Sequence, residues 1–146
     1  MKLRLADLTT SDYPRIMALW QAAGLHVMPR GRDSREAFER QLASGIQTAI
    51  GMETEAGELV GVALTTHDSR KGWINRLAVH PDWRRRGIAT KLIAAAEETL
   101  RGQGMAIIAA LIEPGNDVSL ALFERAGYVE QEPHLHYVTK RESDEV

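Results

Sequence analysis

Three consecutive arginines followed by a glycine make the densest positive charge in the chain. Residues 84–86 stand directly before Gly87, and residues 87–101 repeat apolar side chains every three to four positions, which is typical of an amphipathic helix. The start of a helix exposes unpaired backbone N–H groups and the positive end of the helix dipole, so it attracts anions. Gly87 and Ala89 let a ligand approach that backbone closely. The turn therefore predicts a phosphate or pyrophosphate site.

A run of arginines taken alone is most often a solvated turn, and that alternative stays open at this point. The helix dipole disfavours positive side chains at a helix N-terminus, a cost that is easier to understand if an anion binds there. The segment has neither the GxxxxGK[ST] pattern of nucleoside-triphosphate loops nor the GxGxxG pattern of dinucleotide-binding turns. The motif thus favours an anion site without naming the ligand.

The composition limits the kinds of protein that the chain can be. Its 146 residues suit one domain, expected over residues 1–146, and its net charge of −2 argues against nucleic acid as a partner. The chain has no cysteine, which excludes disulfides and thiolate chemistry. We see neither a signal peptide nor the roughly 20 apolar residues of a membrane span, so we expect a cytoplasmic protein with no membrane partner.

The pattern of apolar residues predicts one mixed sheet covered by helices. Residues 105–112 are uninterruptedly apolar, as in a strand buried on both faces. The predicted strands are residues 2–6, 46–53, 59–66, 71–79, 105–112, 127–129 and 134–140. The predicted helices begin at residues 11 or 12, 33 or 34, 87, and 116 or 117.

Two segments resemble a known family. Residues 77–98, LAVHPDWRRRGIATKLIAAAEE, are similar to the acetyl-coenzyme A (acetyl-CoA) motif of the GNAT superfamily of N-acetyltransferases, in which Arg/Gln-x-x-Gly-x-Gly/Ala follows a strand and a V-x-P turn. Residues 116–128, NDVSLALFERAGY, resemble the family's second cofactor segment. Each motif alone is moderately specific, and both together in the right order are strongly so.

The resemblance implies an α/β fold: a GNAT-like central mixed, mostly antiparallel sheet of six to seven strands, with four flanking helices and a slot where two strands splay apart for the cofactor. It also implies an acyltransferase of the EC 2.3.1 type that uses acetyl-CoA as co-substrate without a metal. The expected reaction is direct attack by a primary amine, on a small molecule, protein or peptide, and a homodimer is expected. The alternative is a silent module that binds acyl-CoA without turnover.

The cofactor contacts carried over from the family are mostly backbone groups. Asn116 is equally explained as a plain helix cap, and both roles are compatible. The backbone amide at Val79 suits the stabilisation of an oxyanion. The full set implied by the resemblance is Leu77, Ala78, Val79, Arg84, Arg85, Arg86, Gly87, Ile88, Ala89, Thr90, Asn116 and Phe123.

The chain departs from the family at the residues that move protons. Phe123 stands where the family often has a tyrosine, and phenylalanine cannot donate a proton. Tyr128 is a substitute acid, although packing at the sheet edge explains it as well. Glu113 is a candidate base, although a loop position explains it too. Water is the alternative for both steps.

The acceptor site implied by the resemblance lies between the first two helices, their loop and the last strands. Trp73 and Asn75 would face it from the strand before the arginine turn, and Arg30 and Arg32 from the loop. Those two arginines suit an acceptor that carries an acidic group, although such side chains are usually solvated.

Overall fold

The fold is built on one five-stranded sheet with the strand order β1-β2-β3-β4-β5. The computed structural model describes residues 2–131 and 135–146. Neighbouring strands run antiparallel except β4 and β5, which are parallel. The strands are β1 (Leu3–Asp7), β2 (Gln47–Thr54), β3 (Leu59–His67), β4 (Gly72–Val79) and β5 (Ile108–Ala109).

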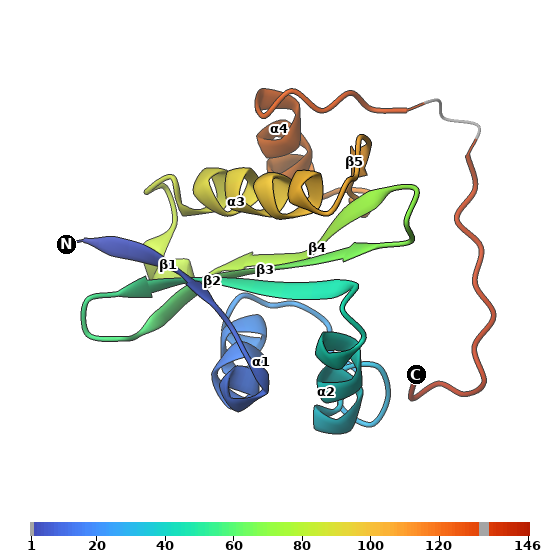
Figure 1. Ribbon diagram of the computed structural model, residues 1–146, viewed down its shortest axis with the longest axis horizontal. Helices are drawn as coiled ribbons and strands as arrows, with labels where there is room; N and C mark the ends of the chain where they lie inside the picture. The colour runs from blue at the N-terminus through green and yellow to red at the C-terminus, as the bar shows by residue number, and fades with distance from the viewer. Residues whose placement is uncertain (1, 132–134) are drawn as a thin grey trace.

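Helices cover both faces of the sheet (Figure 1). In the figure α1 and α2 lie on one face, and α3 and α4 lie on the other. Short 3-10 turns, η1 (Thr10–Asp12) and η2 (Pro81–Trp83), precede α1 and the arginine turn. The helices are α1 (Tyr13–Ala22), α2 (Arg35–Ala43), α3 (Ile88–Gly102) and α4 (Asp117–Arg125). Mixed α/β architecture, a mostly antiparallel sheet and four helices confirm the predicted fold class.

Alternation along the strands divides the core into two layers. Ala63 of β3 packs in the same layer as Leu92 of α3, whereas its neighbours Val62 and Leu64 pack with the layer of α1 and α2. Successive strand residues point to opposite faces, so the same strand supports both helix layers.

Two glycines of the sheet, Gly61 and Gly72, leave room for side chains at the two ends of helix α3. A Cβ on Gly61 would lie 2.8 Å from Ile88 Cγ2 in the first turn of α3. A Cβ on Gly72 would lie 2.8 Å from Leu100 Cδ1 in its last turns. The absence of a side chain at Gly61 therefore sets how closely the start of α3 approaches the sheet.

Strands β4 and β5 separate soon after they meet. They pair only at Gly72 with Ile108 and at Trp73 with Ala109, while β4 continues to Val79. The predicted splay between two strands is confirmed here. It leaves the second half of β4 without a neighbouring strand on that side among the residues described.

A bulge interrupts β4 within this second half. Val62 of β3 stands opposite Ala78 and Leu64 stands opposite Asn75, so two residues of β4 face one residue of β3. One of the two, Arg76, has a φ of 52°, in the left-handed region that few non-glycine residues adopt. The bulge re-aims the side chains of β4 where it enters the splayed region.

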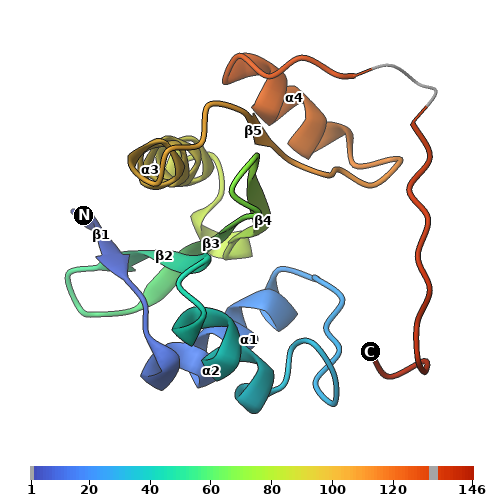
Figure 2. The same cartoon turned by 45° about the vertical axis from the view of Figure 1, so that its right-hand side comes forward.

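The two closing strands predicted from the sequence are wrong for the residues that the structure describes. Residues 127–129 and 135–140 form no strand, and residue 134 lies outside the described residues. The side chains of Leu135, Tyr137 and Val138 are 77–84% exposed. Figures 1 and 2 show residues 135–146 running clear of the sheet. Alternating apolar residues favour a strand, but here no sheet edge lies beside them to pair with.

The fifth strand is much shorter than the predicted 105–112. It comprises two half-buried residues, and Ile107 and Leu111 are 54% and 65% exposed. These exposures contradict the prediction of a strand buried on both faces, and no strand of the described residues pairs with its outer edge. The sheet accordingly has five described strands in place of the predicted six to seven. No helix within the described residues is both long and apolar enough to cross a membrane.

Candidate functional site

A cavity of about 870 Å³ opens where β4 leaves β5. The end of α1, the second half of β4, the arginine turn with the start of α3, and α4 all contribute to its walls. The residues that line it are Ala23, Leu25, Leu77, Ala78, Val79, Trp83, Arg84, Arg85, Gly87, Ile88, Ala89, Thr90, Asn116, Val118, Ser119, Leu122 and Arg125.

The cavity is positively charged in a chain whose net charge is negative. Among residues 2–131 and 135–146, the charged residues that line it are Arg84, Arg85 and Arg125, and no carboxylate is among them. Fixed positive charges in a partly enclosed space attract anions more strongly than the same charges do in open solvent. The arrangement suits a ligand with several negative charges.

The N-terminus of α3 points its backbone at the same cavity. Gly87 occupies the cap position with a φ of 75°, and no side chain caps the helix. The first amides of the helix, at Ile88, Ala89 and Thr90, therefore lack the partner that a capping side chain would supply. All three residues line the cavity, so a bound anion would satisfy these donors.

Only two of the three consecutive arginines, Arg84 and Arg85, line the cavity. Arg85 has a φ of 63°, a left-handed conformation that bends the chain sharply before the helix. Arg86 instead lies over the indole of Trp83, with 4.6 Å between its guanidinium carbon and the ring centroid. Arg86 is not among the lining residues, unlike its two neighbours.

Asn116 combines the two roles that the sequence left open. Its Oδ1 accepts a hydrogen bond of 3.2 Å from the Ser119 amide, which makes it the cap of α4. It also lines the cavity. The sequence analysis missed the side chains of α4 that follow it, although Val118, Leu122 and Arg125 stand at the spacing of a single helix face.

Phe123 lies in the core and not at the cavity. It is 5% exposed and packs edge-on against Tyr128, with 5.0 Å between the ring centroids. Ten of the twelve predicted cofactor residues line the cavity, and Phe123 and Arg86 are the two that do not. Leu25 lies in the loop predicted to contact the acceptor, whereas sequence analysis named neither Ala23 nor Trp83, although Trp83 lies within residues 77–98.

The hydroxyl of Tyr128 is committed to a partner outside the cavity. It donates a hydrogen bond of 2.8 Å to Glu97 Oε2 on α3. Burial raises the pKa of the Tyr128 hydroxyl above its ordinary value, and the hydrogen bond to Glu97 adds to this. Packing against α3 therefore accounts for this tyrosine.

We expect Tyr128→Phe to lose about 1.5–3 kcal/mol of unfolding free energy, the size of one hydrogen bond to a charged group, and to keep any turnover at the cavity within about threefold. Because the folded-state pKa is raised, this contribution is complete below the ordinary tyrosine pKa of about 10 and is lost as pH rises through the folded value. Denaturant unfolding of both proteins between pH 7 and 11 checks this. A large loss of kcat would instead show that the Tyr128 hydroxyl takes part in catalysis.

The predicted acceptor and base residues are not gathered at the cavity. Asn75 donates to Thr66 Oγ1 over 2.9 Å, and Arg30 pairs with Glu145 over 3.1 Å. Trp73 of β4 stands opposite Thr66 of β3 and Ala109 of β5. Arg32 is exposed. Glu113 is exposed in the loop before α4, where its carbonyl accepts from the Asn116 amide. None of these residues lines the cavity.

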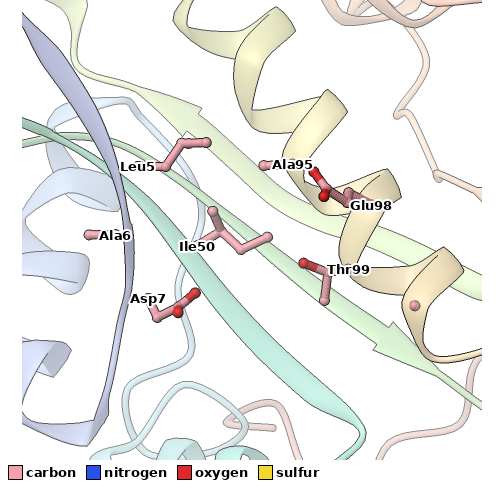
Figure 3. Close-up of a pocket in the computed structure, with 8 residues that line it drawn as sticks. Leu5, Ala6, Asp7, Ile50, Ala95, Glu98 and Thr99 are labelled. Carbon is pink, nitrogen blue, oxygen red and sulfur yellow. The ribbon is translucent and has the colours of Figure 1, made fainter.

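A second hollow, of about 410 Å³, lies between β1 and α3 (Figure 3). Figure 3 shows Leu5, Asp7 and Ile50 on the strands facing Glu98 and Thr99 on the helix. Its charged lining residues are the carboxylates Asp7 and Glu98, the wrong sign for a phosphate-bearing ligand. The larger cavity is therefore the candidate functional site. Within the described ranges, no three His, Asp or Glu side chains gather as metal ligands.

Comparisons with known proteins agree with this geometry. The sequence profile of the Acetyltransferase (GNAT) family matches residues 6–128. The acetyltransferase plu1384 of Photorhabdus laumondii is 29% identical over 130 residues, which cover 89% of each chain. Among solved structures, the aminoglycoside N-acetyltransferase AAC(6')-Iy in complex with a bisubstrate analogue is similar with a TM-score of 0.80 and 20% identity, over 97% of this chain and 100% of that one. The ribosomal-protein-S18-alanine N-acetyltransferase of Escherichia coli gives 0.70 and 21%, over 90% and 80%.

Proposed function

Because this chain belongs to the GNAT acetyltransferase family, we propose that it transfers the acetyl group of acetyl-CoA to a primary amine by direct attack. The observation that carries the proposal is the cationic cavity into which the uncapped N-terminus of α3 opens. A pyrophosphate carries the charge that this end of the cavity attracts. The slot between β4 and α4 then accommodates an extended arm.

The cofactor contacts follow from the walls of the cavity. The amides of residues 88–90, with Arg84 and Arg85, would hold the pyrophosphate. The main chain of residues 77–79 would hold the pantetheine arm, opposite Asn116 on α4. Acetyl-CoA supplies a thioester whose carbonyl gains negative charge during attack, and the Val79 amide is proposed to stabilise that charge.

Proton transfer is proposed to run mainly through water. Within the described part of the chain, no histidine, aspartate or glutamate lines the cavity, and the hydroxyl of Tyr128 donates to Glu97. Glu113 remains the candidate base on this chain, since its loop leads directly into Asn116 at the cavity. A thiolate tolerates the absence of a strong acid better than an alkoxide does, because thiols have the lower pKa.

The acceptor is proposed to be a small-molecule amine or a protein or peptide amine. The similar structures include enzymes named for aminoglycosides and for a ribosomal protein, so both classes belong in a test. Ala23 and Leu25 form an apolar wall at the α1 end of the cavity. Trp73, Asn75, Arg30 and Arg32 stay proposals for acceptor contacts that would require the adjoining loop to move. We also propose one domain over residues 1–146, in the cytoplasm.

The test is release of coenzyme A thiol from acetyl-CoA with a panel of aminoglycosides, polyamines, amino acids and peptides with free N-termini. Calorimetry on the same sample measures acetyl-CoA binding. Binding with amine-dependent release supports the transferase. Binding without release across the panel would favour the alternative of a silent acyl-CoA-binding module. Absence of binding would overturn the assignment of the cavity.

A homodimer is proposed on a separate observation. The exposed apolar side chains of residues 135–138 and those of Ile107 and Leu111 along β5 lack cover within the described residues. A second copy could pair its extended segment with this sheet edge. Because the chain has no cysteine, a mixture of Leu111→Cys and Tyr137→Cys proteins should form a disulfide-linked heterodimer on oxidation. A mixture that stays monomeric at high concentration would contradict the proposal.

A further inference from the structure

Arg76 is the charged residue at the centre of the β4 bulge. Its left-handed backbone turns the side chain out of the ordinary strand alternation, towards α1 and the loop that joins α1 to α2. No motif marks this residue, and it does not line the cavity. Its contacts nevertheless join two walls of that cavity.

The guanidinium of Arg76 makes three contacts across this junction. It lies over the indole of Trp20 on α1, with 4.4 Å between its central carbon and the ring centroid. Its Nη1 donates a hydrogen bond of 2.8 Å to the carbonyl of His26. Its Nη2 lies 3.8 Å from Asp33 Oδ2 at the far end of the same loop. One side chain thus touches the helix and both ends of the loop.

Hydrogen bonds within the α1–α2 loop and to α1 hold the loop in one conformation, and two of them involve Asp33. Asp33 Oδ2 accepts a hydrogen bond of 2.8 Å from the Met28 amide, and the Asp33 carbonyl accepts one of 2.6 Å from the Tyr13 hydroxyl. The Leu25 amide donates to the Trp20 carbonyl over 2.9 Å. Arg76 therefore holds a preformed loop and not a loose segment.

Burying this charge is costly, so the arrangement calls for an explanation. Burial lowers the pKa of the Arg76 guanidinium, and Asp33 only partly opposes that effect. Its Nε and Nη2 atoms are buried and find no hydrogen-bond partner among the residues that the structure describes. An apolar side chain would pack on Trp20 without these penalties, so packing alone does not account for an arginine here.

The residues next to Arg76 and next to its partner His26 indicate what Arg76 does. Leu77, next to Arg76, lines the cavity from β4, and Leu25, next to His26, lines it from the end of α1. We propose that Arg76 is a positioning residue that sets the separation of these two walls and thereby shapes the acceptor end of the cavity. That this end of the cavity binds the acceptor rests on the proposed function. The link that Arg76 makes between the two walls does not depend on it.

The test compares Arg76→Asn with Arg70→Asn. Asparagine tolerates the left-handed backbone better than most residues do, so the first variant removes the guanidinium with little added strain. Arg70 is an exposed arginine in the turn before β4, and its side chain makes no ion pair within the described residues. It is a matched control for loss of one positive charge.

We expect Arg76→Asn to speed amide hydrogen exchange in residues 25–33 by at least tenfold, and to raise the KM for the amine found in the panel by at least tenfold. The Kd of coenzyme A should stay within threefold and kcat within fivefold. Arg76→Lys keeps the charge but cannot bridge Trp20, His26 and Asp33 at once, so it should show the same pattern more weakly. Arg70→Asn should change none of these values.

Three results would overturn the proposal. Unchanged exchange in the loop would show that Arg76 does not hold it. Equal losses in the affinity for coenzyme A and for the amine would show a general structural role. Faster exchange throughout the sheet in both Arg76 variants would show the same. The exchange measurement needs no amine, so it decides the tie between the walls even if the proposed function fails.

Discussion

Arg84→Glu will weaken coenzyme A binding by about tenfold to about a hundredfold. The change removes a cation from the positive end of the cavity and places a carboxylate there, at the proposed pyrophosphate site near the amides of α3. A hydrogen bond to a charged group contributes about 1.5–3 kcal/mol, and about 1.4 kcal/mol corresponds to a factor of ten in Kd. Calorimetric titration with coenzyme A measures the effect directly.

Arg70→Glu is the control for this change. It alters the net charge by the same amount from the turn before β4, outside the cavity lining. Its Kd should stay within about twofold of the parent protein at physiological salt, where charges beyond about 8 Å are screened. If both variants weaken binding equally, the effect comes from overall charge and the assignment of the turn fails.

Gly61→Val will weaken coenzyme A binding as well as stability, whereas Gly72→Val will weaken stability alone. In both variants new methyl groups overlap α3, at Ile88 in the first case and at Leu100 in the second. Overpacking of this kind costs about 1–3 kcal/mol of unfolding free energy. Only the first variant lifts the end of α3 whose amides face the cavity.

The pair separates two effects that a single variant would mix. Denaturant unfolding should place the two proteins within about 1 kcal/mol of each other, in keeping with the similar overlaps. The Kd of coenzyme A should rise about tenfold in Gly61→Val and less than about threefold in Gly72→Val, a difference of roughly 1 kcal/mol. Equal affinities in the two variants would show that the position of the first turn of α3 does not control binding.

The gathering of the arginine turn, the start of α3 and Asn116 at one cavity, the proposed cofactor end, could be predicted from the sequence because backbone geometry builds it. A glycine at a helix cap, small residues in the first turn and an asparagine before the next helix each have a local structural cause. Those causes place Gly87, Ala89 and Asn116 at one cavity once the two helices pack on the same sheet face. The positions of α1 to α4 follow from local periodicity in the same way.

The α1 end of the cavity, the proposed acceptor end, could not be predicted residue by residue, because tertiary contacts determine it. The sequence around Arg76 does not predict that its side chain contacts His26, which is 50 residues away along the chain. The contact of the Arg86 guanidinium with the Trp83 ring and the burial of Phe123 against Tyr128 also depend on packing. The closing strands failed for a related reason, since a strand needs a neighbour and residues 135–140 have none within the described chain.

The most direct test of the central claim is an NMR titration of the ¹⁵N-labelled protein with coenzyme A. If the cavity is the coenzyme A site, the largest amide shifts will fall on residues 77–79 and 87–90, with smaller shifts at the start of α4. The hollow between β1 and α3 should be unaffected. Shifts centred on Asp7 and Glu98, or the absence of shifts at millimolar coenzyme A, would contradict the account.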